Sequence, residues 1–313
     1  MEKKKNYYKQ KWKNDLIFFI CIILLPAIQF AIFYVGVNIN SILMAFQSFE
    51  RDPETMIGAY EFLDGNIFKN FETMFWQLKN DSALEFALGN TLLAFVITTG
   101  VGMTLALLFS LYIYKSMLLS KTFRMLLFAP SILSTVVTVR MYTNFVEIVL
   151  PAMIPSMGGK GLLSNTDTVM FAVLFFSVWI GFGTQILMYS GAMNTIDNSV
   201  IEAAKLDGAG PLREFVSIIL PLIYPTFVTF MVTNIAGLFV NQINLYTFYG
   251  SSAPDRYVTF GYYLYVKTAA GTGTGSYAEY PVLACFGLLF TAIAVPVVLG
   301  GKRLLEKIGP KTI

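Results

Sequence analysis

The chain lacks histidine altogether, contains only two cysteines and carries few charges: Asp, Glu, Lys and Arg make up 13% of its 313 residues. The absence of histidine excludes Ser-His-Asp triads, imidazole acid–base catalysis and histidine metal sites. The chain also lacks the G-x-x-x-x-G-K-[ST] pattern of P-loop ATPases. We therefore expect no catalytic residue, no metal site and no cofactor.

Apolar residues, by contrast, are in excess. Hydrophobic residues make up 56% of the chain, and 28 Phe and 17 Tyr contribute much of that surface. A soluble domain is about 45–50% apolar and about 25% charged. A core of this length cannot hide so much apolar surface from water. The composition therefore predicts an all-α protein that spans a membrane several times.

The apolar residues gather in six charge-poor runs. A hydrocarbon core about 30 Å thick needs roughly 20 apolar helical residues, and each run is long enough. The fifth run is long enough for a span and a non-helical tail. The runs are Leu16–Val37, Phe86–Tyr114, Met125–Val146, Thr168–Ile196, Phe215–Pro254 and Tyr280–Gly301. Six spans put both termini on one side of the membrane.

The basic residues give the orientation, because Lys and Arg mark the cytoplasmic side. With the N-terminus inside, the inner segments hold 15 of the 22 basic residues and only 7 of the 19 acidic ones. We therefore expect cytoplasmic N- and C-termini. Cys21 then lies near the inner end of the first span and Cys285 near the outer end of the sixth, so no disulfide is expected between them.

Two long segments, 38–85 and 255–279, fall on the predicted outer side. The first is polar and acidic. The second contains the repeat Gly271-Thr272-Gly273-Thr274-Gly275. Because this repeat does not follow a strand, we interpret it as a flexible loop and not as a phosphate-binding loop.

The inner loop between the fourth and fifth runs, residues 197–215, has the pattern of a helix–turn–helix elbow. Ser199 and Glu202 have capping-box spacing, which predicts the start of a short helix. Gly208 can adopt positive φ and end that helix. Pro211 suits the first turn of a second helix. We call this segment the elbow.

Within the elbow the sequence resembles the signature loop of ABC importer permeases: Glu-Ala-Ala, three residues, Gly, nine residues, Ile-x-Leu-Pro. The residues that match this loop are Glu202, Ala203, Ala204, Gly208, Ile218, Leu220 and Pro221. Asp207-Gly208-Ala209, Asn90-Thr91-Leu92, Phe123-Arg124 and Ala129-Pro130 resemble the carbohydrate, maltose-type subgroup. The resemblance covers roughly residues 86–301. The chain departs from the family at Asp197-Asn198, where a Pro is common, and at 249–254, where Thr-Gly-Gly-Pro is usual.

The resemblance implies a type I ABC importer permease fold with six transmembrane helices in a bacterial cell membrane. It implies a permease core at 86–301, preceded by a basic tail, first helix and extracellular segment at 1–85 and followed by a basic tail at 302–313. The implied partners are a second permease, a dimer of cytoplasmic ATP-binding subunits, an extracellular solute-binding protein and a sugar-like solute, with no nucleic acid. The residues that would couple to the ATPase are Glu202, Ala203, Ala204, Asp207 and Gly208.

A polar stripe in the outer half of the fifth run is the candidate solute path. Asn234, Asn241 and Gln242 fall on one face at helical spacing, and Tyr246 lies close to that face. Amides do not face lipid, so the stripe faces water or a partner helix, and helix packing stays open as the alternative. Arg140 either reaches the outer interface or faces a wet cavity, where it would bind solute or pair with Glu147.

The function expected from these features is import of a sugar or oligosaccharide, driven by a separate ATPase. The alternative is a secondary transporter of a neutral solute driven by an ion gradient. That alternative calls for buried acids or half-helices near the membrane midplane. Asp and Glu are absent from the six runs except near their ends, and no inverted repeat is evident.

Overall fold

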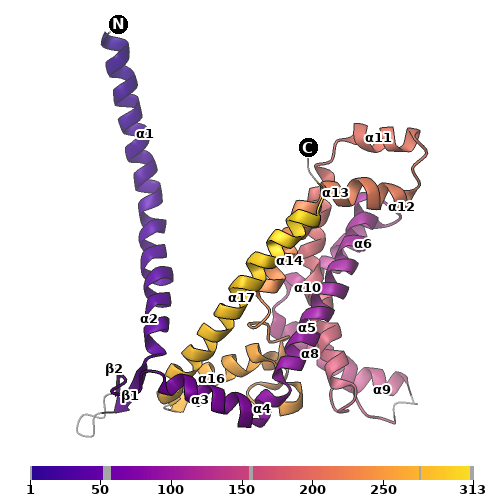
Figure 1. Ribbon diagram of the computed structural model, residues 1–313. Helices are drawn as coiled ribbons and strands as arrows, with labels where there is room; N and C mark the ends of the chain where they lie inside the picture. Colours follow the sequence, from indigo (N-terminus) through magenta and orange to yellow (C-terminus); the bar gives the residue numbers. More distant parts are fainter. Residues whose placement is uncertain (1, 52–57, 155–157, 275, 311–313) are drawn as a thin grey trace. The chain divides into compact units, whose positions relative to one another are not determined.

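A computed structural model describes residues 2–51, 58–154, 158–274 and 276–310 (Figure 1). The described residues are mostly helical, with one two-stranded sheet. The chain divides into two units. The first unit comprises residues 1–74 and 275–288, and the second comprises 75–274 and 289–313.

The first unit begins with a long helix and continues into a small hairpin. The helical segments α1 (Glu2–Gln29), η1 (Phe30–Gly36) and α2 (Val37–Met44) follow one another without interruption, and 15–44 is long and apolar enough to cross a membrane. Strands β1 (Gln47–Arg51) and β2 (Gly58–Phe62) pair antiparallel, with Gln47 opposite Phe62. The buried Asn70 of α3 (Lys69–Asn80) donates to the Ala45 and Gln47 carbonyls at 2.9 and 2.8 Å. Its amide therefore holds the hairpin to the helix.

Both cysteines are free thiols, as expected. Cys285 is buried, and its Sγ lies 3.6 Å from the Ala45 carbonyl oxygen, whereas Cys21 is exposed on α1.

The second unit is a helical bundle around one central helix. Its helices and helical turns are α4 (Ser82–Glu85), α5 (Ala87–Phe95), η2 (Val96–Val101), α6 (Gly102–Tyr114), α7 (Ser120–Ile132), α8 (Thr135–Asn144), η3 (Phe145–Val149), α9 (Leu150–Met153), α10 (Val169–Asn194), α11 (Asn198–Leu206), α12 (Pro211–Glu214), η5 (Phe215–Ile219), α13 (Leu220–Leu222), α14 (Tyr224–Ala236), α15 (Leu245–Tyr249), η6 (Asp255–Tyr257) and α16 (Phe260–Thr274). The turn η7 (Ser276–Glu279) belongs to the first unit, and α17 (Tyr280–Ile308) enters the second at residue 289.

Helix α10 packs against α6, α7 and α14 in the core of this bundle. Large side chains of α6 and α10 interlock there, with Ile113, Ile186, Tyr189 and Met193 almost fully buried. The buried Ser110 hydroxyl lies 2.6 Å from the Ala106 carbonyl and 3.1 Å from that of Ile186. The centre of the bundle is therefore largely apolar. The Ser110 hydroxyl is satisfied by backbone, whereas the buried Tyr189 hydroxyl has no hydrogen-bond partner among the described residues.

Five helical stretches of the described residues are long and apolar enough to cross a membrane, and a bent pair makes a sixth if it counts as one span. The bent pair joins 211–222 to α14 at 69°. Pro221 and Pro225 flank the bend at Ile223. A proline lacks an N–H donor and disfavours helical geometry in the residue before it, so two of them bend this span.

The third predicted run, Met125–Val146, is broken. Leu133 and Ser134 adopt extended backbone, with ψ of 153° and 130°, and separate α7 from α8. Thr138 donates its N–H to the Ser134 carbonyl at 3.0 Å, which starts α8 afresh. The stretch long enough to span the membrane is therefore 135–153. An apolar composition alone does not reveal such a break.

The prediction of a flexible loop over Gly271–Gly275 is wrong for the described part of it. Helix α16 extends through residues 271–274, and Gly275 lies outside the described residues. Thr259 begins the helix, because its hydroxyl accepts the Tyr262 N–H at 3.2 Å and its carbonyl accepts that of Tyr263 at 2.9 Å. The described part of the repeat is thus helical despite the low helix propensity of Gly and Thr.

Candidate functional site

The elbow forms the predicted helix pair, α11 followed by α12, at one end of the second unit (Figure 1). Asp197 starts the first helix: its carboxylate accepts the Ser199 N–H at 2.9 Å. The predicted cap at Ser199 is therefore wrong by two residues, because a carboxylate is a better acceptor than a hydroxyl at a helix N-terminus. Accepting hydrogen bonds from the Ser199 backbone and side chain lowers the pKa of Asp197.

Gly208 ends α11 as predicted. Its φ is +76°, and the Ala209 N–H donates to the Ala204 carbonyl at 3.0 Å across the turn. A Cβ added to Gly208 would meet nothing within 4 Å. Glycine is therefore required here for its backbone conformation alone. Pro211 then opens α12 in the predicted position.

The two faces of α11 differ. Ile201 and Ala204 are buried, and Ile201 belongs to the apolar cluster that contains Ile113, Met193 and Ile219. Of the two alanines that match the signature loop, Ala203 is therefore exposed and Ala204 faces the bundle. The residues left exposed on the outer side are Glu202, Ala203, Lys205, Leu206 and Asp207. Leu206 is 89% exposed and gives this side an apolar tip.

An ion pair ties the second helix of the elbow to the bundle. Glu214, at the end of α12, is only 2% exposed, and its carboxylate contacts the Lys115 ammonium group at the end of α6. The elbow is thus held from two sides: Ile201 packs into the apolar cluster, and Glu214 binds Lys115.

A polar cavity of about 300 Å³ lies between α5–α6, α10 and the end of α14. We call it the amide hollow. Its polar side chains are Thr98, Ser177, Gln185, Asn234, Asn241 and Asn244, and no charged residue lines it among the described residues. The Gln185 side-chain oxygen is buried without a hydrogen-bond partner in the described chain. The hollow therefore offers an unsatisfied amide oxygen to a polar, uncharged occupant.

The structure brings Asn234 and Asn241 together, but not by the helical spacing that predicted it. Helix α14 ends at Ala236, and the chain continues through a turn to Ile243 and Asn244, which have φ of 45° and 60°. The Asn241 side-chain oxygen accepts the Ile243 N–H at 2.9 Å and stabilises this irregular path. A helical stripe from 234 to 246 is therefore wrong, because the fifth run stops being helical at its midpoint.

Close packing of α16 fixes this irregular segment. A Cβ on Gly261 would lie 2.4 Å from the Val240 carbonyl oxygen, so only glycine permits the approach. The Thr259 hydroxyl donates to the Asn241 carbonyl at 3.1 Å. Helix α16 thereby positions Asn241 at the hollow.

The other predicted path residues do not line the amide hollow. The side-chain oxygen of Gln242 is buried without a partner among the described residues, outside the lining. Tyr246 packs edge-on against Tyr265, with ring centroids 4.7 Å apart. Both residues follow the end of α14, so the helical spacing that placed them on one face with Asn234 does not apply.

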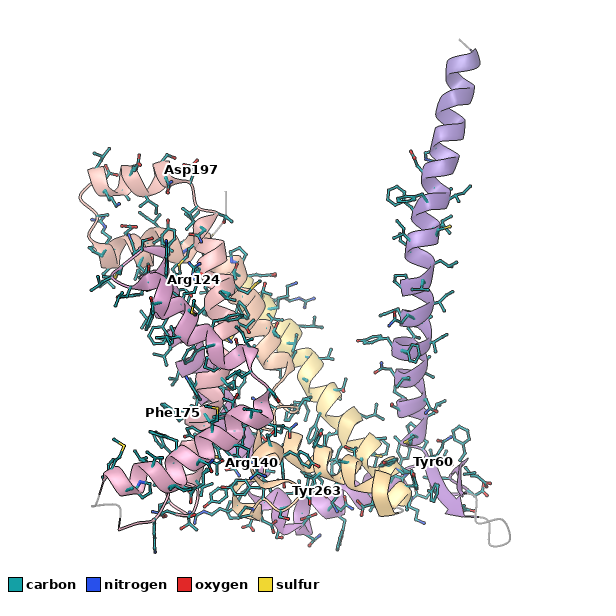
Figure 2. The ribbon with its side chains drawn as sticks, turned by 180° about the vertical axis from the view of Figure 1, so that it is seen from behind. Tyr60, Arg124, Arg140, Phe175, Asp197 and Tyr263 are labelled. Atoms are coloured by element: carbon teal, nitrogen blue, oxygen red, sulfur yellow. The ribbon has the colours of Figure 1, made fainter. Side chains whose placement is uncertain are left out.

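Arg140 lies on the exposed side of α8. Glu147 instead accepts hydrogen bonds from the Leu163 and Ser164 N–H groups at 2.6 and 3.1 Å. Its carboxylate is engaged by this loop, so the suggested Arg140–Glu147 pair does not form. Figure 2 shows Arg140 and Asp197 toward opposite ends of the second unit.

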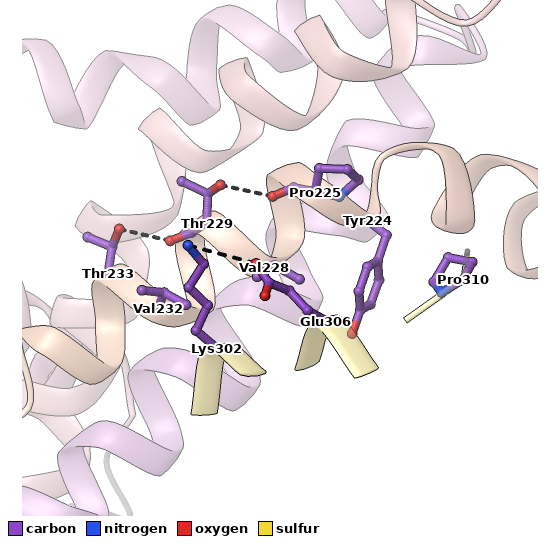
Figure 3. A pocket seen from close by; sticks show the side chains of 9 residues that line it. All are labelled: Tyr224, Pro225, Val228, Thr229, Val232, Thr233, Lys302, Glu306 and Pro310. Carbon is purple, nitrogen blue, oxygen red and sulfur yellow. Dashed lines mark hydrogen bonds and ion pairs between the residues drawn. The ribbon is translucent and has the colours of Figure 1, made fainter. Parts of the chain in front are cut away.

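Two further hollows follow α14. A groove of about 840 Å³, the terminal groove, lies between α14 and the last turns of α17 (Figure 3). A hollow of about 300 Å³, the middle hollow, shares Thr233 with the terminal groove. It shares Thr98, Asn234 and Asn241 with the amide hollow. All three hollows are lined in part by residues of α14.

Sequence reasoning missed several residues of the hollow, and Gln185 is the clearest. It is the only Gln, Asn or charged residue between Thr168 and Gly191, so its isolation in an apolar run was a usable signal. Thr98 and Ser177 gave no such signal, because single hydroxyl residues are common in membrane helices, where they bond to their own backbone. The Thr98 hydroxyl does so with Ala94 at 2.7 Å.

Residues 98–311 match the family model described as binding-protein-dependent transport system inner membrane component. The sn-glycerol-3-phosphate transport system permease protein UgpA of Escherichia coli O6:K15:H31 is 34% identical over 135 residues, which are 43% of this chain and 44% of that protein. UgpA of Yersinia pseudotuberculosis serotype I is 25% identical over 214 residues, 67% of this chain and 73% of that protein. The chain thus spans less than half of the first relative and about three quarters of the second.

Two solved structures have a similar fold. One is a bacterial ABC transporter involved in the import of the acidic polysaccharide alginate, with a TM-score of 0.72, 19% identity, and coverage of 96% of this chain and 99% of that chain. The other is a bacterial alginate ABC transporter in complex with an alginate pentasaccharide-bound periplasmic protein, with a TM-score of 0.73, 19% identity, and coverage of 97% and 99%.

Proposed function

This chain belongs to the family of binding-protein-dependent transport system inner membrane components, and from that premise we propose that it imports a sugar or oligosaccharide. It is a multi-pass membrane transport subunit and not an enzyme. In our proposal a separate ATPase drives it through the elbow. The observation that carries the proposal is the exposed elbow, whose second helix leads through one bend into α14, a wall of the amide hollow.

We propose that the outer side of α11 is the surface on which the ATPase docks. Glu202, Ala203 and Asp207 are exposed there, and the 89% exposed Leu206 would be buried by a partner. Exposed apolar tips rimmed by charges are typical of interaction sites. Gly208 sets the angle of the helix pair, and Ala204 packs α11 to the bundle.

The amide hollow and its two neighbours are proposed as this chain's half of the solute path. Amide and hydroxyl groups bind sugar hydroxyls, and the described lining of the amide hollow carries no charge, which favours an uncharged solute there. The terminal groove differs, because Lys302 and Glu306, paired at 3.8 Å, are part of its lining. The relatives are named for sn-glycerol-3-phosphate and the solved structures for the acidic alginate, both anions. The uncharged lining of the amide hollow therefore supports a neutral solute for this chain, in a transporter of the same family.

We propose a second permease as the partner that completes the path, because the hollows along α14 are lined by this chain alone. We further propose two cytoplasmic ATPase subunits, an extracellular solute-binding protein and cytoplasmic termini in a bacterial cell membrane. We propose that the chain is divided into a permease core at 86–301 and flanking segments at 1–85 and 302–313. Against an ion-gradient mechanism, no acidic residue lines the amide hollow among the described residues, and Glu306 of the terminal groove is paired with Lys302.

Charge reversal on the docking face tests the coupling. The variant Glu202→Lys in the complete reconstituted complex is expected to lower ATP hydrolysis stimulated by the solute-loaded binding protein severalfold. Affinity for the binding protein should not change, because that protein would dock on the predicted outer side, which includes α4 and α16. Helix α11 lies at the other end of the unit from both (Figure 1). Lys121→Glu, an exposed charge reversal on α7, is the matched control. Equal stimulation in both variants and the parent would remove the docking role from α11.

A further inference from the structure

The ion pair between Lys115 and Glu214 joins two parts of the second unit that are 99 residues apart in the chain. Glu214 is 2% exposed, and the Lys115 side chain is 26% exposed. Among the described residues this is the ion pair that links separate helices, since the other, Lys302–Glu306, lies within α17. A buried carboxylate without its cation would carry a large desolvation cost, so the two ends are held together firmly.

Each partner leads to a different wall of the amide hollow. Lys115 follows the last residue of α6, and α5, η2 and α6 form one helical stretch that carries Thr98 and Gly102 to the hollow. Glu214 ends α12, and the chain runs from there through the bend at Ile223 to α14, which carries Asn234. The elbow is therefore attached to α14 covalently and to α6 through the ion pair.

We propose that the Lys115–Glu214 pair transmits movement of the elbow to α6, so that both walls of the amide hollow move together. The inference rests on the proposed function and assigns these two residues a positioning role within it. The connection to α14 passes through a 69° bend at Ile223, whereas the pair acts directly at the end of a continuous helix. Without the pair, elbow movement would reach the Asn234 wall and leave the Thr98 wall behind.

The other contacts between the elbow and the bundle do not replace the Lys115–Glu214 pair as a directional link. Ile201 and Phe215 pack the elbow onto the apolar cluster, and this packing is not directional. A charge-assisted hydrogen bond fixes distance and orientation as well as contact. The pair therefore supplies a link that apolar packing alone does not.

The test uses the complete transporter, reconstituted after Cys21 and Cys285 are replaced by Ser. Single cysteines are then introduced at Thr98 or at Asn234, and their reaction with a methanethiosulfonate reagent is followed before and after trapping with ATP and vanadate. This probe needs no knowledge of the solute. The parent is expected to change reactivity at both positions on trapping.

The deciding variant is the double change Lys115→Met and Glu214→Leu. It removes both charges and leaves no unpaired buried ion, a replacement that often keeps stability. We expect the response at Thr98→Cys to fall roughly threefold or more, a coupling effect of the usual size, while the response at Asn234→Cys persists. The reversed pair, Lys115→Glu with Glu214→Lys, should restore the Thr98→Cys response. Lys121→Met is the control for loss of a nearby exposed lysine.

Unchanged responses at both positions in the double variant would overturn the inference. Loss of both responses would also overturn it, because the pair would then serve only to hold the elbow in place. Absence of any response in the parent would instead contradict the proposed function, since the elbow would not move the hollow at all.

Discussion

The elbow and the amide hollow are built in opposite ways. The elbow takes its shape from neighbours in the sequence: Asp197 caps a helix, Gly208 ends it, and Pro211 starts the next. The hollow takes its shape from contacts far apart in the chain, such as Gly261 against Val240 and the broken path after α14. Local rules therefore predict the proposed coupling surface, whereas the proposed solute path depends on tertiary packing.

The largest expected effect comes from filling the close contact that shapes the hollow. Gly261→Ala puts a Cβ 2.4 Å from the Val240 carbonyl oxygen, which cannot move without shifting Asn241. We expect a loss of about 1–3 kcal/mol of stability from such overpacking. It is measured as a lower unfolding temperature of the purified protein in detergent, together with lost uptake.

Gly89→Ala in α5 is the control, because nothing lies within 4 Å of its added Cβ. An unfolding temperature for Gly261→Ala equal to that of Gly89→Ala would show that the hollow tolerates repacking and is not fixed by this contact.

The next effect tests whether the elbow depends on backbone conformation alone. Gly208→Val places a β-branched residue at φ of +76°, which costs roughly 1–2 kcal/mol. We expect severalfold lower stimulation of ATP hydrolysis by the solute-loaded binding protein. Gly208→Asn should retain most of it, because Asn tolerates positive φ.

Gly210→Val serves as the matched position two residues on, where φ is −69° and the added Cβ meets nothing. If Gly208→Val and Gly210→Val couple equally well, the turn at 208 is not what positions the docking face.

A smaller effect is expected at the amides of the hollow. Each hydrogen bond to a sugar hydroxyl contributes roughly 0.5–1.5 kcal/mol, so Asn234→Ala should slow uptake by a factor of about two to twelve. Asn241→Ala should do the same. Tyr246→Phe should have no effect, since its ring packs on Tyr265 outside the hollow.

These variants are compared by initial uptake rates in vesicles at matched protein levels, with ATP hydrolysis measured in parallel. Unchanged rates for both asparagine variants would mean that the amides serve helix packing, which is the alternative that the sequence leaves open.

The smallest effect is a pH dependence of the elbow. Hydrogen bonds to Ser199 lower the pKa of Asp197 from its ordinary value of 3.8. The ionised cap therefore stabilises α11 above that ordinary value, and this stabilisation is lost as the pH falls through the lowered pKa. Because Asp197 is exposed, the effect is small.

Hydrogen exchange of the α11 amides in the parent and in Asp197→Asn follows this cap. The two should differ near neutral pH and converge in acid. Equal protection at all pH values would show that the carboxylate charge is not part of the cap.

The difference between the elbow and the amide hollow explains which features the sequence could predict. Membrane insertion, five of the six spans by composition, and the turns at Gly208 and Pro211 follow from local signals. The break at Leu133–Ser134 and the end of α14 at Ala236 do not, because both lie within apolar runs that a composition count treats as continuous. Helix α16 was missed because the Gly-Thr repeat at its C-terminal end favoured a loop, while its cap, Thr259, lies at the opposite end of the helix.

For the site, the sequence placed Asn234 and Asn241 together for the wrong reason and missed Gln185. Helical spacing predicted that both residues share one face of a continuous helix. In the structure Asn234 lies in α14, and Asn241 reaches the same hollow from the non-helical segment that follows it. The sequence could not show whether Arg140 pairs with Glu147, because Glu147 accepts hydrogen bonds from the loop at Leu163 and Ser164, which is distant in the chain.

Uptake by the complete reconstituted transporter tests the central claim most directly, that ATP acting through the elbow drives an uncharged solute along α14. Radiolabelled neutral oligosaccharides are compared with sn-glycerol-3-phosphate and alginate oligosaccharide, in the parent and in Glu202→Lys. The account predicts uptake of a neutral saccharide that requires ATP, exceeds uptake of both anions, and falls severalfold in Glu202→Lys. Uptake restricted to the anions, or driven by an imposed ion gradient without ATP, would contradict it.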